Sequence, residues 1–95
     1  MTKQEISAMH REGLSVGSVT LRAERETVVA GYNGTQRGYE TTYTGEKDGK
    51  VMFAVTPRHL PDRGFMVVWC QTGKVEIRPG TEKPLDVAVE LAQQL

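Results

Sequence analysis

Residues 64–78, Gly-Phe-Met-Val-Val-Trp-Cys-Gln-Thr-Gly-Lys-Val-Glu-Ile-Arg, contain the longest unbroken apolar run of the chain and its single tryptophan. Residues 65–70 are apolar throughout, which is typical of a strand covered on both faces. Residues 74–78 alternate polar and apolar side chains, as in a strand with one face in solvent. The stretch therefore predicts a β-hairpin with a central first strand and a second strand nearer the sheet edge.

The turn of this hairpin decides which side chains face the core. A loop of Gln71, Thr72 and Gly73 would use the glycine for the left-handed backbone conformation. A two-residue Thr72-Gly73 turn would place Cys70 opposite Val75, but it requires a positive φ of a β-branched threonine, which is costly. We therefore expect the three-residue loop, whose register gives the central core pairs: Trp69 opposite Val75, and Val67 opposite Ile77.

The composition excludes several classes of protein. The 95 residues predict a single domain, residues 1–95, and the 12 basic and 12 acidic side chains give zero net charge. A neutral chain has no long-range field that attracts nucleic acid or an anionic membrane. One cysteine cannot form an internal disulfide, and no segment resembles a signal peptide or a membrane span of ~20 apolar residues. We expect a cytoplasmic protein without membrane contact.

Both ends of the chain predict helices. Thr2 and Glu5 match the T-x-x-E capping box, and Gly13 is suited to end the helix, which we expect over residues 3–12. Its apolar stripe is thin, so residues 1–13 are expected to be loosely attached. Near the other end, Thr81 is the expected cap of a helix with Pro84 in its first turn. Its apolar face would comprise Leu85, Ala88, Val89, Ala92 and Leu95, widened by Val87 and Leu91.

The middle of the chain reads as an antiparallel meander. We expect strands over residues 16–21, 27–32, 39–44 and 50–56, with residues 22–26 as a polar connection and residues 57–63 as a surface loop. A turn at Asn33-Gly34 would bring Val28 opposite Tyr39, with a bulge at Gly38. A Lys47-Asp48-Gly49 loop would bring Tyr43 opposite Phe53, with Val51, Phe53 and Val55 on one face.

The predicted fold is an α+β, two-layer domain: a four- or five-stranded antiparallel meander sheet with an N-terminal and a C-terminal helix on one face. This order of elements resembles that of the double-stranded RNA-binding domain over most of the chain. In that family the second helix opens with a lysine cluster that faces phosphate. Here Glu82-Lys83-Pro84-Leu85-Asp86 has one lysine between two acids, so the resemblance is one of element order.

No residue pattern predicts catalysis, a cofactor or a metal. Cys70 lies in an apolar strand, away from the electropositive surroundings that activate a thiol, so neither His10 nor His59 is expected to serve it as a base. Two histidines and one cysteine without clustered spacing do not form a zinc set. We therefore expect a protein that is not an enzyme.

The function that remains is binding. Two segments carry more Arg, Tyr and His than turn formation requires, and loops on a rigid sheet are usual recognition sites. We predict a small protein-binding module that acts as an adaptor or inhibitor of a larger assembly, and its small size suits a module encoded by a phage or mobile element. The alternative is a weak nucleic-acid-binding domain that uses the Arg/Tyr hairpin, which zero net charge disfavours. The predicted partner-binding residues are Arg37, Tyr39, Arg58, His59 and Arg63.

Overall fold

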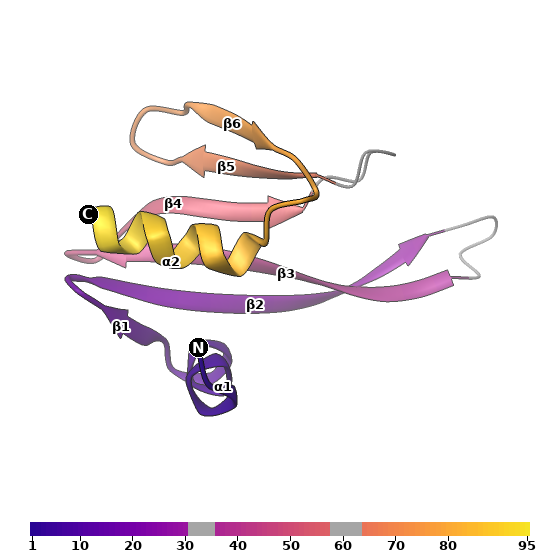
Figure 1. Ribbon diagram of the computed structural model, residues 1–95, viewed down its shortest axis with the longest axis horizontal. Helices are drawn as coiled ribbons and strands as arrows, with labels where there is room; N and C mark the ends of the chain where they lie inside the picture. Colours follow the sequence, from indigo (N-terminus) through magenta and orange to yellow (C-terminus); the bar gives the residue numbers. More distant parts are fainter. Residues whose placement is uncertain (31–35, 58–63) are drawn as a thin grey trace.

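The computed structural model describes the backbone of residues 1–30, 36–57 and 64–95, and the side chains of residues 1–25, 40–57 and 64–95. The described strands form one antiparallel sheet of six strands in sequence order, with a helix at each end (Figure 1). The predicted α+β meander is confirmed, with more strands than expected. The elements are α1 (Lys3–Arg11), β1 (Leu14–Val16), β2 (Val19–Ala30), β3 (Gln36–Lys47), β4 (Lys50–Pro57), β5 (Phe65–Trp69), β6 (Val75–Arg78) and α2 (Pro84–Gln94).

Helix α1 begins as its sequence predicts. The Glu5 N–H donates to Thr2 Oγ1 at 3.2 Å, and the Thr2 N–H donates to Glu5 Oε1 at 3.1 Å. The bond from the Thr2 backbone lowers the pKa of the Glu5 carboxyl. Gly13, with a φ of 96°, follows the end of the helix. Met9 is only 1% exposed and attaches α1 to the core.

Residues 22–26 are part of β2, so the expectation of a polar connection there is wrong. The run is polar, yet burial alternates over residues 21–24: Leu21 and Ala23 are buried in the core, while Arg22 and Glu24 are exposed. The alternation fits a strand with one buried face. Arg22 also reaches the neighbouring strand β3, where its Nε lies 3.4 Å from Glu46 Oε1.

The β2–β3 register differs by one residue from the expected one. Val28 pairs with Gly38, and Thr27 pairs with Tyr39. The ladder continues without a shift from Thr20 to Ala30, so the described backbone has no bulge at Gly38. The buried end of β2 sets this register, because a slip there would turn its apolar face into solvent. The expected Asn33-Gly34 turn lies outside the described residues.

The β3–β4 turn is shorter than expected. Asp48 and Gly49 have φ values of 53° and 76°, as in a two-residue type I′ turn. A bulge follows in which β4 carries one extra residue, Met52, so that Tyr43 lies opposite Val55 instead of Phe53. The bulge also changes the face of two side chains. Met52 packs against the core, whereas Val51 is 38% exposed, contrary to prediction.

The β5–β6 hairpin has a four-residue loop, residues 70–73, instead of the expected three. The Trp69 N–H donates to the Lys74 carbonyl at 2.8 Å, and Gly73 has a φ of 74°. Val75 therefore pairs with Val68, and Ile77 pairs with Met66. This one-residue difference reverses the faces of β6. Val75 and Ile77, predicted as core, are 49% and 54% exposed.

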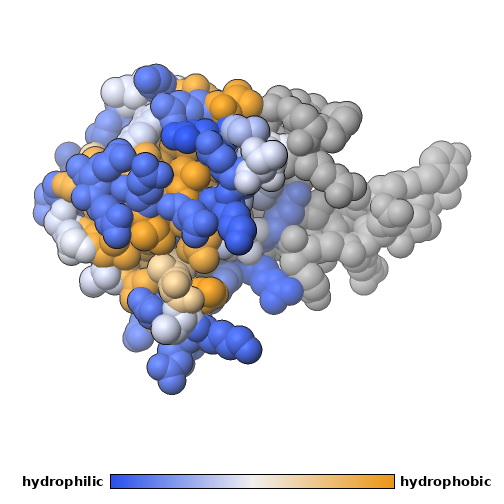
Figure 2. Space-filling view, in the orientation of Figure 1, coloured by the Kyte–Doolittle hydropathy of each residue, from blue (hydrophilic) through white to orange (hydrophobic). Residues whose placement is uncertain are grey.

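The core lies between the sheet and the helices. Phe53, Val55 and Val67 are fully buried on the face that α2 covers. Helix α2 contacts β2, β3 and β4 and runs roughly along the strands (Figure 1). The helix buries Val87, Ala88, Leu91 and Ala92, while Leu85, Val89 and Leu95 pack at its margins. Its cap position is Lys83, which makes no side-chain cap bond, so the expected Thr81 cap is wrong. On this side of the molecule, apolar side chains show between polar ones (Figure 2).

Candidate binding pocket

The structure places the predicted partner-binding residues only in part. Arg37 and Tyr39 lie on β3, where their backbones pair with Val29 and Thr27, and their side chains are outside the description. Beyond β4, strands β2 and β3 continue as a two-stranded ribbon that projects from the sheet (Figure 1). The remaining three, Arg58, His59 and Arg63, fall within residues 58–63, outside the described residues. The proposed role of all five stays a prediction.

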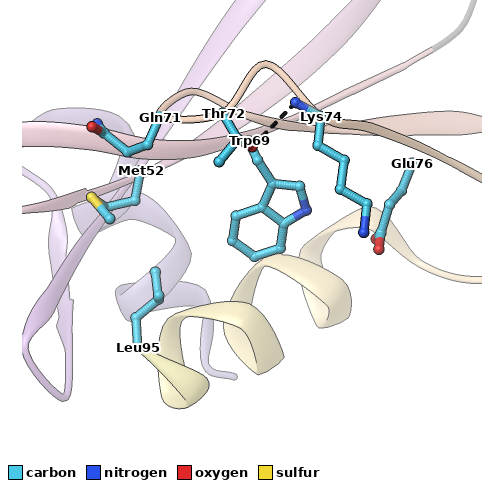
Figure 3. Close-up of a pocket in the computed structure, with 7 residues that line it drawn as sticks. All are labelled: Met52, Trp69, Gln71, Thr72, Lys74, Glu76 and Leu95. Atoms are coloured by element: carbon cyan, nitrogen blue, oxygen red, sulfur yellow. Dashed lines mark hydrogen bonds between the residues drawn. The ribbon is translucent and has the colours of Figure 1, made fainter.

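The structure also contains a hollow that the sequence did not indicate. It has a volume of about 360 Å³ and lies where the β5–β6 hairpin meets the C-terminal end of α2 (Figure 3). We call it the Trp69 pocket. Its lining combines three apolar and four polar side chains: Met52, Trp69, Leu95, Gln71, Thr72, Lys74 and Glu76.

Trp69 is the central side chain of this pocket. Its indole lies between the hairpin loop and α2, with Met52 and Leu95 on one side and Lys74 and Glu76 on the other (Figure 3). The ring packs at a tilt of 60° on the buried ring of Phe53, with 5.9 Å between centroids. Trp69 is nevertheless only half-buried. The core therefore holds one part of the indole, and another part faces the pocket.

Hydrogen bonds tie the pocket loop to its surroundings. Thr72 Oγ1 accepts from the Lys74 N–H at 3.3 Å, and Gln71 Nε2 donates to the Val51 carbonyl at 3.4 Å. Lys47 Nζ donates to the Leu95 carbonyl at 2.8 Å, which joins α2 to the β3–β4 turn. A cation beside carbonyls at a helix C-terminus is also favoured by the helix dipole. These bonds connect the β5–β6 loop to β4, and the end of α2 to the β3–β4 turn.

A second hollow adjoins the first. It has a volume of about 350 Å³ and shares Met52 and Gln71 with the Trp69 pocket. The side chains that it adds are Lys47, Asp48 and Lys50. We call the two neighbouring hollows together the groove; their lining includes three apolar side chains, three lysines and two carboxylates. The charged side chains of this lining are thus slightly basic in sum, although the whole chain is neutral.

The groove could not be predicted because the expected positions of two of its residues were wrong. Trp69 was expected in the middle of a strand with both neighbours buried, but β5 ends at Trp69 and Cys70 is an exposed loop residue. Met52 was expected on the opposite face from Phe53. A tryptophan directly before a glycine-containing loop was the available signal, because a strand end is less covered than a strand centre.

Residues 1–30, 36–57 and 64–95 contain no group of three His, Cys, Asp or Glu side chains that could hold a metal ion. In the same ranges, no helix is long and apolar enough to cross a membrane.

Comparison of the chain with protein-family models, with curated proteins and with solved structures found no match. Function is therefore inferred from the geometry of the groove.

Proposed function

We propose that this chain is a small, non-enzymatic protein-binding module, an adaptor or inhibitor of a larger assembly, that takes an apolar side chain of its partner into the Trp69 pocket. The observation that carries the proposal is the half-buried indole of Trp69, which borders a hollow of about 360 Å³ instead of completing the core. Tryptophan is among the residues that contribute most to protein interfaces.

The lining favours a particular chemistry in the partner. A hollow at the lower end of the ligand-pocket range, ~300–1,000 Å³, suits one side chain such as Leu, Met or Phe. Met52 can adapt its flexible thioether to different shapes. Lys47, Lys50 and Lys74 lie around the floor. Carboxylates beside the inserted side chain would complement these lysines. The partner segment is therefore acidic with an apolar anchor.

Trp69→Ala is expected to abolish partner binding while the domain stays folded. Because the ring is half-buried, we expect the substitution to cost about 1–3 kcal/mol of stability. Full burial, as the sequence implied, would cost about 3–5 kcal/mol. Val68→Ala is the matched control, since Val68 is half-buried on the same strand and faces the opposite side.

Affinity capture from the source cells with quantitative mass spectrometry tests this expectation. The baits are the unmodified chain, Trp69→Ala, Val68→Ala, and the triple variant Arg37→Ala, Arg58→Ala, Arg63→Ala. A protein retained by all baits except Trp69→Ala, and shown by calorimetry with purified components to bind directly, supports the pocket. Loss with the triple variant alone would assign the interface to the residues predicted from sequence. Retention by both folded variants would contradict both sites.

The alternative from the sequence, weak nucleic-acid binding, has its own test. We expect no measurable binding to duplex DNA, duplex RNA or single strands at ~150 mM salt, because affinity of this kind depends on neutralising phosphates. The chain has zero net charge. Fluorescence anisotropy with labelled oligonucleotides measures it. Submicromolar binding that weakens steeply with salt would place nucleic acid ahead of a protein partner.

A further inference from the structure

Strand β6 forms one edge of the sheet. It pairs with β5 on one side, and within the described part of the chain no strand or helix pairs with its other side (Figure 1). The Trp69 N–H donates to the Lys74 carbonyl, so these two residues occupy a hydrogen-bonded position of the ladder. Such pairs recur at every second position of an antiparallel ladder. Glu76 and Arg78 therefore direct their backbone groups to β5, while Val75 and Ile77 direct theirs outward.

The side chains of this edge are unusually apolar for a free surface. Val75 and Ile77 are 49% and 54% exposed on the face away from the helices, beside half-buried Val68 and Met66. Free edges of this kind are templates for pairing with another strand. The outward backbone groups and the apolar side chains thus occur at the same two residues.

We infer that β6 pairs with β6 of a second copy of this chain, antiparallel, with the twofold axis at Ile77. When two β6 strands pair antiparallel, directly opposite side chains lie on the same face of the sheet. The twofold axis can then pass through Glu76 or through Ile77, and the charges of the opposed side chains distinguish the two registers. A register centred on Glu76 would set Glu76 against its own copy and Lys74 against Arg78. The register centred on Ile77 sets Glu76 opposite Arg78 of the second copy, twice. Opposite charges across strands stabilise a pair, and like charges destabilise it.

The edge also limits its own assembly. Pro79 follows β6 and has no N–H, so the ladder ends there, although its carbonyl can still accept from the Val75 N–H of the second copy. A contact related by a twofold axis is closed and does not propagate into fibres. Zero net charge removes long-range repulsion between copies. A contact between two such short strands is smaller than the ~1,200–2,000 Å² of stable interfaces. We expect a micromolar dissociation constant.

Sedimentation equilibrium of the full chain tests the register. The unmodified chain is expected to dimerise as its concentration rises, and Ile77→Glu and Ile77→Lys are each expected to remain monomeric. An equimolar mixture of the two variants is expected to regain dimers, because the introduced carboxylate and ammonium groups face each other at the axis. Ile77 is exposed, so circular dichroism should show both variants folded.

Val75→Glu and Val75→Lys are the matched controls. In the proposed register Val75 lies opposite Pro79 of the second copy, so their mixture should gain no dimer over either variant alone. A monomeric unmodified chain, a dimeric Ile77→Glu variant, or a mixture of Ile77 variants that stays monomeric would each overturn the inference. If the mixture of Val75 variants formed dimers and the mixture of Ile77 variants did not, the proposed register would be wrong. The pocket proposal is separate, since Trp69→Ala should dimerise like the unmodified chain.

Discussion

Phe53→Ala is expected to lower the free energy of unfolding by about 3–5 kcal/mol. Phe53 is fully buried on β4 and packs on the ring of Trp69. Its removal would leave a cavity under α2 and take away the support of the pocket indole. Domains of this size have a total stability of about 5–15 kcal/mol. The variant should therefore lose a large fraction of its stability and unfold at a much lower urea concentration.

Urea titration followed by circular dichroism measures this loss, since Trp69 fluorescence would itself respond to the missing ring. Ile77→Ala is the control, at a concentration where the chain is monomeric. With Ile77 exposed, we expect a cost below about 1 kcal/mol. If the hairpin had the register expected from sequence, Ile77 would be buried beside Val67 and the cost would be about 2–5 kcal/mol. A large effect at Ile77 or a small one at Phe53 would contradict the observed register.

Gly45→Ala is expected to cost about 1–3 kcal/mol through overpacking. Gly45 is buried on β3 directly opposite Phe53. A Cβ added there would overlap Cε1, Cζ and Cδ1 of the Phe53 ring. The ring is fully buried, so it has little room to move away. At an unconstrained strand position the same change would be favourable, because glycine weakens strands.

A double-mutant cycle with Phe53→Leu isolates this contact. Without the aromatic ring, Gly45→Ala should cost less, and we expect a coupling of at least about 0.5 kcal/mol between the two sites. Both variants and the double variant are measured by urea titration. If the stability losses of the two substitutions were additive, the cost of Gly45→Ala would not come from a clash with the Phe53 ring.

The two ends of the chain were predictable because their signals are local. The capping box needs only Thr2 and Glu5, three positions apart, and it forms as expected. Leu91 and Ala92 are buried because helical spacing puts them on the apolar face of α2. The meander followed from glycine-containing turns between apolar strands. Such features depend on neighbours within one helical turn or one hairpin, so residue types alone specify them.

Strand register could not be derived in the same way. Side chains alternate with a period of two, so a loop that is one residue longer exchanges the faces of a whole strand. Residues 70–73 differ from the expected loop only by Cys70, yet this places Val75 and Ile77 in solvent. Cys70 is apolar enough for either role. The choice decides which side chains of β6 lie on the core side of the sheet, and no residue within the loop specifies it.

The sequence by itself determined the α+β meander, the helix start at Thr2 and the buried face of α2. Tertiary structure alone decided the registers and hence the candidate pocket. That pocket requires the bulge that turns Met52, the strand end at Trp69 and the position of Leu95 directly after α2. These residues are far apart in sequence, and no local preference relates them. They meet because the buried side chains pack well in only one combination of registers.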